Sequence, residues 1–203
     1  MNNVDLNQNR RHFLKLLSTG SLFCLGCGTL CAMPQSNQKA ETKHKFKLDS
    51  KFSFEQLFDF TFNPTIETMR GLEKQIGSET FINMLKEVSA KRGAKMGRQM
   101  AKNFPKNDLA AFTMIMKKPN YFWENVLTLK IVEDTEKAFE IKVQECLWAK
   151  TFQKYRAEDL GYTMICHPDF AMAKAFNPGI KLLRTKTLMQ GHDHCDHRWV
   201  FEG

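Results

Sequence analysis

Residues 126–143, VLTLKIVEDTEKAFEIKV, decide the fold class of this chain. Apolar residues dominate 126–132, residues 133–137 are polar, and apolar residues alternate with charged ones over 139–143. Because alternate side chains share one face of a strand, and a short polar turn joins antiparallel neighbours, this pattern is typical of a hairpin. The stretch therefore predicts an antiparallel hairpin with one face in solvent.

Upstream of this hairpin, the apolar residues follow a helical spacing from Phe52 to Met116. Ser and Asp often accept hydrogen bonds from the first turn of a helix, whereas Gly and Pro often end one. On these signals we predict three helices: over 65–76 ending at Gly77, from an N-cap at Ser78 to about Asn103, and over 109–116 after an N-cap at Asp108.

Downstream of the hairpin, short helical and extended patterns alternate. We predict helices over 147–155, 158–166 and 169–176, a turn over 177–179, and two final strands over 180–189 and 194–201 joined by 190–193. The fold class is therefore α+β: an N-terminal helical half, then a small antiparallel sheet with inserted helices, ending in a β-hairpin. Residues 52–203 are expected to form a single domain.

Composition narrows the class of protein. The chain has 203 residues, 42% hydrophobic and 26% charged, which excludes collagen-like, low-complexity and wholly disordered chains. The formal net charge is +8, and its densest basic group lies on one predicted helix and its exit, over 86–106. Such a group is usually a solvated helix face, and no nucleic-acid-binding motif accompanies it. We therefore expect no nucleic-acid partner and favour a small anionic substrate or an anionic membrane surface.

The N-terminus has the features of an export signal. Arg10 and Arg11 precede Phe13, Leu14 and Lys15, and residues 16–38 carry no charge. The paired arginines and the weakly hydrophobic run resemble a twin-arginine (Tat) signal.

This resemblance implies export in the folded state by the Tat translocon. We expect a signal over residues 1–32, a polar linker over 33–51, and a periplasmic or otherwise extracytoplasmic mature protein with no stable membrane span. A retained anchor, which would leave the protein membrane-attached, and lipidation at Cys27 remain alternatives.

The last forty residues hold most of the reactive side chains. They include Cys166-His167-Pro168-Asp169 and the run 191–199, GHDHCDHRW. On a strand, Cys195, His197 and Trp199 would share one face, and Asp196 and Arg198 the other.

Four elements in this region occur in a specific order: Cys-x-x-Asp at 166–169, Asn-Pro at 177–178, the run 183–188, and Gly-x-x-x-Cys-Asp-x-Arg at 191–198. Together they resemble the L-2-amino-thiazoline-4-carboxylic acid hydrolase family, and the similarity extends back over roughly 55–203. The resemblance implies an α+β fold and hydrolytic opening of a cyclic amidine, a thiazoline ring that bears a carboxylate.

Such a reaction needs a base or a thiolate, an acid for the leaving atom, and a cation for the substrate carboxylate. The candidate nucleophiles are Cys166 and Cys195, the candidate acids or bases Asp169 and Asp196, the candidate carboxylate ligands Arg184 and Arg198, and the candidate proton carriers His167 and His197. For each cysteine the alternative is a buried small hydrophobic residue, and for each arginine a surface ion pair.

Two other arrangements of these residues remain open. One is a single metal ion, Zn, Cu or Fe, with His167, His192 and His194 as candidate ligands, although no standard zinc spacing is present. The other is a disulfide between Cys166 and Cys195. The sequence thus favours an exported hydrolase, with a non-enzymatic metal- or small-molecule-binding protein of the cell envelope as the alternative.

Overall fold

A computed structural model describes residues 52–118 and 121–202 of the chain. The expected signal over residues 1–32, with Arg10, Arg11 and Cys27, and the linker over 33–51 lie outside the described residues. Among the helices that are described, none is long and apolar enough to cross a membrane.

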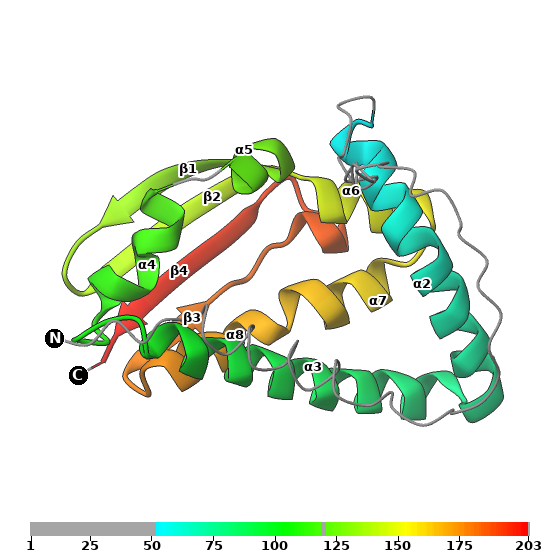
Figure 1. Cartoon of the computed structure of the whole chain (residues 1–203), viewed down its shortest axis with the longest axis horizontal. Coiled ribbons are helices and arrows are strands. Elements are labelled where there is room, and N and C mark those ends of the chain that lie inside the picture. Colours follow the sequence, from blue (N-terminus) through cyan, green and yellow to red (C-terminus); the bar gives the residue numbers. More distant parts are fainter. Residues whose placement is uncertain (1–51, 119–120, 203) are drawn as a thin grey trace, which may run out of the picture. The chain divides into compact units, whose positions relative to one another are not determined.

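The predicted hairpin forms half of a four-stranded antiparallel sheet (Figure 1). Its strands are β1 (Leu127–Asp134), β2 (Ala138–Cys146), β3 (Ile180–Leu183) and β4 (Cys195–Phe201), in the spatial order β1-β2-β4-β3. The last strand in the sequence, β4, thus lies between the first hairpin and β3. The α+β fold class predicted from the sequence is confirmed.

Strand β3 is shorter than the predicted 180–189. It ends at Leu183 because the backbone N–H groups of the next residues do not continue the ladder. Those of Thr185 and Lys186 donate instead to the carboxylate of Asp196, at 2.9 and 2.5 Å. A 3₁₀ turn (η2) follows at Leu188–Gln190.

The helices before the sheet are α2 (Phe54–Ile76), α3 (Ser78–Ala101), α4 (Leu109–Lys117) and α5 (Tyr121–Val126). Helix α4 confirms Asp108 as an N-cap, since its carboxylate accepts a hydrogen bond from the Ala111 backbone at 2.9 Å. Helix α3 corrects the other cap: Gly77, with φ of 86°, precedes the first turn, and Ser78 is its first residue.

Two further predictions were wrong at these helices. Helix α2 begins eleven residues earlier than predicted, since a capping box between Ser53 and Gln56 starts it and Pro64 lies inside it. The sequence also assigned Val126 to a strand, but it ends α5, a helix that the apolar pattern missed.

Four helical segments separate β2 from β3. They are α6 (Leu147–Lys154), α7 (Glu158–Gly161), a π-helical segment η1 (Tyr162–Cys166) and α8 (Pro168–Phe176). Segments α7, η1 and α8 follow one another in space (Figure 1). Both η1 and α8 pack against α3, and α8 also packs against β3.

Two clusters of buried side chains make up the core. One lies between the sheet and helices α4 and α8, where Phe112, Phe139 and Trp199 are buried. The other lies beneath α2, α6 and α7 and includes Phe152 and Leu160. Both clusters contact Cys146, just before α6, and Leu188, in the η2 turn.

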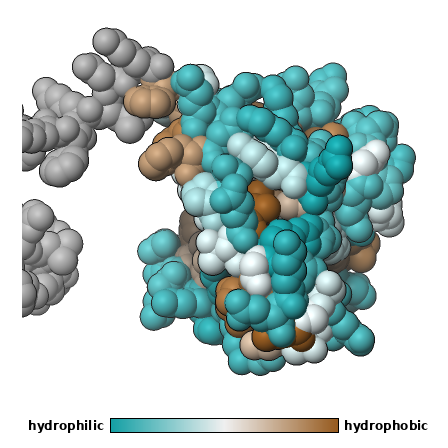
Figure 2. Space-filling model, turned by 90° about the vertical axis from the view of Figure 1, so that its right-hand side faces the viewer, coloured by the Kyte–Doolittle hydropathy of each residue, from teal (hydrophilic) through white to brown (hydrophobic). Residues whose placement is uncertain are grey.

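The basic residues over 86–106 lie on the exposed side of α3 and just beyond it. Figure 2 shows that hydrophilic side chains cover most of the domain on one side, with hydrophobic ones scattered between them. The sequence prediction of a solvated helix face is thus correct for α3.

Helix α3 approaches α8 closely because two of its glycines face the α8 backbone. A Cβ on Gly93 would lie 2.3 Å from the carbonyl oxygen of Pro168, and one on Gly97 would lie 2.2 Å from that of Met172. Both distances are far inside van der Waals contact. The pair of glycines therefore sets the position of the helix that carries the N-terminal part of the candidate site.

We expect Gly93→Ala to destabilise the domain by about 1–3 kcal/mol, because the added methyl group forces α3 away from α8. Gly71→Ala is the matched control, since a Cβ there meets nothing within 4 Å. It should stabilise the chain by about 0.5–1 kcal/mol through helix propensity. Urea unfolding measures both, and equal effects of the two substitutions would contradict the close approach.

Candidate active site

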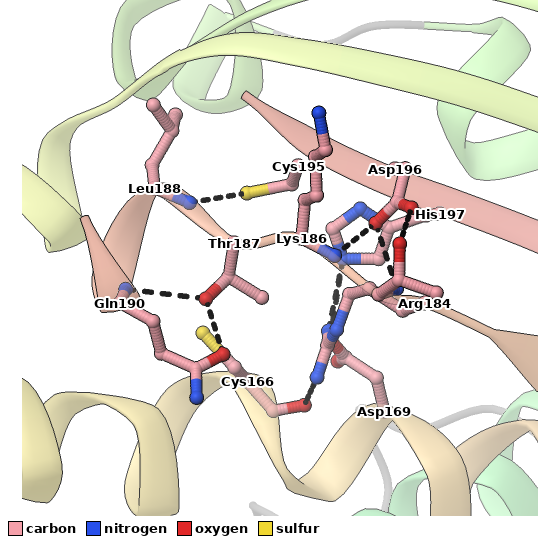
Figure 3. Close-up of polar contacts among 11 residues, drawn as sticks. Cys166, Asp169, Arg184, Lys186, Thr187, Leu188, Gln190, Cys195, Asp196 and His197 are labelled. Atoms are coloured by element: carbon pink, nitrogen blue, oxygen red, sulfur yellow. Dashed lines mark hydrogen bonds and ion pairs between the residues drawn. The ribbon is translucent and has the colours of Figure 1, made fainter. Parts of the chain in front are cut away.

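The guanidinium of Arg184, just after β3, is the centre of the candidate site (Figure 3). Its Nη1 donates to Asp169 Oδ2 at 2.9 Å and lies 3.0 Å from His197 Nε2, and its Nη2 donates to the Cys166 carbonyl at 2.9 Å. Only 1% of this side chain is exposed. A buried cation is stable only when its donors are satisfied, so these three partners are a requirement of the fold.

Aromatic rings cover the same guanidinium. Its carbon lies 4.9 Å from the ring centroid of Phe170 and 5.7 Å from that of Tyr162. Both rings come from the η1–α8 segment, which also supplies Cys166 and Asp169. Sequence reasoning did not identify Tyr162 or Phe170, because neither belongs to a recognised motif.

The π-helical segment places these groups. The backbone N–H of His167 donates to the carbonyl of Tyr162 at 2.8 Å, an i+5 bond that widens the turn. Pro168 then opens α8, and Asp169 lies in the first turn of that helix. Single π-helical turns are frequently found at functional sites, where they re-aim side chains.

His197 on β4 faces the same centre. Its Nε2 is 3.7 Å from Asp169 Oδ2, beyond hydrogen-bond length, and its ring stacks on Trp199 with centroids 5.5 Å apart. The Nδ1 atom of His197 is buried, and no hydrogen-bond partner for it exists among the described residues. The structure therefore brings Cys166, Asp169, Arg184 and His197 together.

Asp196 belongs to a different network. Besides the backbone N–H groups of Thr185 and Lys186, its carboxylate accepts a hydrogen bond from Thr185 Oγ1 at 2.6 Å. Burial acts to raise the pKa of Asp196, but these hydrogen bonds outweigh it and hold the pKa below its usual range. With its lone pairs engaged, this carboxylate fixes the connection between β3 and β4.

Arg198 also points away from the centre. Its Nε and Nη2 donate to Glu133 Oε2, both at 3.0 Å, and Glu140 lies at 3.6 Å. Since neighbouring residues of β4 point to opposite faces of the sheet, Arg198 and His197 are on different sides. Arg198 therefore forms an ion pair at the surface, the alternative that the sequence left open for it.

The three described cysteines are free, so the alternative of a disulfide between Cys166 and Cys195 is not realised. Cys195 Sγ accepts a hydrogen bond from the Leu188 backbone at 3.2 Å. Burial is the main cause that raises the pKa of all three thiols, that of Cys146 to about 11, and their charges would repel one another. The thiol form therefore dominates at neutral pH.

The candidate metal ligands are dispersed. His192 Nδ1 lies against the backbone of Thr187, and His194 contacts Asp193 at 2.8 Å. Burial, then the charges of Lys86 and Arg184, lower the pKa of His167. Across residues 52–118 and 121–202, no three His, Cys, Asp or Glu side chains form a group that could hold a metal ion, so the structure does not support the ligand set His167, His192 and His194.

Sequence reasoning also missed the polar network of the β3–β4 connection. Thr187 Oγ1 donates to Gln190 Oε1 at 2.9 Å and accepts from the Gln190 backbone at 3.2 Å (Figure 3). The signal was present in the run 183–188, where Thr187 directly precedes the η2 turn, but its partners become visible only in the folded chain.

Comparison with known proteins identifies one family. The sequence model described as L-2-amino-thiazoline-4-carboxylic acid hydrolase matches residues 54–199. No curated protein matches the chain.

Two solved structures are similar in part. The phenol-responsive sensory domain of the transcription activator PoxR, with phenol, is 12% identical, has a TM-score of 0.47, and covers 68% of this chain and 73% of its own. A trafficking protein particle complex subunit 3 from Naegleria fowleri, covalently bound to palmitic acid, is 12% identical, has a TM-score of 0.43, and covers 73% of this chain and 95% of its own.

The buried thiols make the stability of the domain depend on pH. Between the usual pKa of 9.0 and the raised pKa of about 11, folded Cys146 keeps a proton that the unfolded chain releases. The free energy of unfolding should therefore fall as pH rises from about 9 to about 11, by at most about 1.4 kcal/mol per pH unit for this thiol.

Cys146→Ala should flatten that fall, measured by urea unfolding at each pH. Thr151→Ala is the control, because it alters a buried side chain of the next helix that does not titrate in this range. An unchanged pH slope in Cys146→Ala would contradict the raised pKa.

Proposed function

Because the chain belongs to the L-2-amino-thiazoline-4-carboxylic acid hydrolase family, we propose that it is an exported hydrolase that opens a small cyclic amidine bearing a carboxylate. The observation that carries this proposal is the meeting of Asp169, His197 and Arg184 in one partly buried centre. A base, a proton carrier and a cation are the groups that such a hydrolysis needs.

In the proposed reaction, the oxygen of a water molecule bonds to the amidine carbon as the C=N double bond opens, a base takes one water proton, and the amidine nitrogen gains one. The bond from that carbon to the ring sulfur or nitrogen then breaks as the added oxygen becomes a carbonyl and gives up its second proton, and the leaving atom receives a proton. We assign the base to Asp169, whose side chain keeps 28% of its surface exposed, and the proton donor to His197. The positive charge of Arg184 attracts the substrate carboxylate.

Direct attack by water is favoured over attack by a thiolate. Burial is the main cause that raises the pKa of Cys166 far above its usual value, and the charge of Arg184 offsets only part of this rise. Cys195 is buried and already accepts a hydrogen bond from Leu188. A thiolate is the reactive form of cysteine, and neither residue holds much of it at neutral pH.

Asp169→Asn should lower kcat on 2-amino-thiazoline-4-carboxylate by about 10²–10⁴-fold, the usual contribution of a general base. Mass spectrometry would follow a product heavier than the substrate by one water. Asp159→Asn is the matched control, since Asp159, like Asp169, pairs with an arginine, Arg70 at 2.6 Å, but lies outside the site.

Cys166→Ala separates the two mechanisms in the same assay. Turnover within about tenfold of the wild type supports direct attack by water, and a loss as large as that of Asp169→Asn would assign the nucleophile to the thiol. A well-folded wild-type chain without turnover would contradict the proposed hydrolysis.

Binding without turnover is the second candidate, and one observation favours it. The guanidinium of Arg184 is satisfied by residues of the chain itself, so the centre is stable without a ligand. Calorimetric binding of the same thiazoline carboxylate with no product in the mass spectrometer would support a small-molecule-binding protein of the cell envelope.

Export is the other part of the proposal, and the sequence supports it through the Arg10-Arg11 pair. Replacing both arginines with lysine should keep the full-length chain in the cytoplasm, whereas the wild type appears in the periplasm without residues 1–32. Lys15→Arg is the control, because it preserves the charge and leaves the pair intact. A full-length wild type in the membrane fraction would indicate a retained anchor.

A further inference from the structure

The donors of Arg184 are largely engaged within the chain. Three of the five N–H groups of a guanidinium are accounted for by Asp169, His197 and the Cys166 carbonyl. The rings of Phe170 and Tyr162 lie over it, and its side chain is 1% exposed. A paired-donor contact to a substrate carboxylate needs two adjacent free N–H groups, and both N–H groups of Nη1 and one of Nη2 are already engaged.

The contact with His197 determines where the imidazole carries its proton. Arginine is always a donor and has no acceptor, so at 3.0 Å the Nε2 atom of His197 must present its lone pair to Arg184 Nη1. A neutral imidazole has one proton, which is then on Nδ1. Asp169 cannot reverse this assignment, because its Oδ2 is 3.7 Å from Nε2.

The proton on Nδ1 is not used elsewhere in the described chain. That atom is buried and has no hydrogen-bond partner among residues 52–118 and 121–202, and the same is true of Nε1 on the stacked Trp199. Buried N–H groups normally find an acceptor, and an orphan calls for an explanation. A substrate with an acceptor atom would supply one on displacing the atoms that cover Nδ1.

We infer that Arg184 is a positioning residue: it fixes His197 in the Nδ1-protonated tautomer, so that Nδ1–H is the group His197 offers to the substrate. The contact between Nδ1–H and a substrate rests on the proposed function, whereas the tautomer follows from the contact with Arg184. It replaces the direct carboxylate contact that the sequence suggested for Arg184 by two indirect roles, its charge and its control of the tautomer.

Nitrogen-15 NMR of the histidine rings tests the inference in the full chain without substrate, since protonated and unprotonated ring nitrogens resonate far apart. The His197 signals are assigned by their loss in His197→Gln. We expect the neutral ring in the wild type to show a protonated Nδ1 and an unprotonated Nε2. A wild type with the proton on Nε2, or with both tautomers mixed, would overturn the inference.

Two variants separate this role from simple support of the fold. Arg184→Met should let the Nε2-protonated tautomer appear, whereas Arg70→Met, which removes an arginine paired with Asp159, should leave the His197 signals unchanged. Arg184→Lys should restore part of the wild-type preference, because lysine is also a donor only. An unchanged tautomer in a folded Arg184→Met would count against the inference. Should that variant not fold, the wild-type spectrum and the lysine variant still decide.

Addition of 2-amino-thiazoline-4-carboxylate then links the tautomer to the ligand. The spectra are recorded for the wild type and for Asp169→Asn, which should turn the compound over slowly. A shift of the His197 Nδ1 signal supports Nδ1–H as the group that contacts the ligand. A shift confined to Nε2 contradicts it. The absence of turnover with a correctly placed proton would reject the proposed hydrolysis while leaving the role of Arg184 intact.

Discussion

Burial of one guanidinium constrains the C-terminal half of this protein. A cation withdrawn from water costs several kcal/mol unless its donors are satisfied. Arg184 meets this demand with groups from the η1–α8 segment and from β4. The sheet edge, the π-helical turn and the first turn of α8 are therefore held in one arrangement by the same charge.

Two other features make that arrangement possible. The carboxylate of Asp196 binds backbone N–H groups of residues 185 and 186, which ends β3 directly after the arginine. On the other side of the segment, Gly93 and Gly97 allow α3 to contact the α8 backbone. The first feature depends on a carboxylate that accepts three hydrogen bonds. The second depends on a helix that has glycine at two positions. Together they place Arg184 at a depth where its partners are obligatory.

Most of the fold could be predicted from local patterns in the sequence. The polar turn at 133–137 and the period of two over 139–143 identified the first hairpin, and Asp108 identified the start of α4, because these signals act within a few residues. Predictions failed where distant contacts decide. Strand β3 ends early through a bond to Asp196, and the sequence had no means of pairing residues eleven positions apart across a loop.

The candidate site was predictable as a set of residues, but the sequence could not assign their roles. The elements over 166–198 contain Cys166, Asp169, Arg184 and His197, which lie near one another in the structure. It also included Arg198, which the alternation of β4 turns toward Glu133 instead. Tyr162 and Phe170 were missed, since their contribution is a ring face over a cation and no spacing rule predicts it.

The chemistry that this site favours follows from what burial does to each kind of group. Burial protonates the thiols, because a thiolate gains nothing from apolar neighbours. The Arg184 cation stays charged because it is paired, and in doing so it orients an imidazole whose remaining N–H has no partner in the described chain. A centre with protonated sulfur, a partly exposed carboxylate and an oriented imidazole is better suited to moving protons than to forming a bond through sulfur. Within a family named for hydrolysis, these features favour activation of water by the carboxylate and proton donation by the imidazole.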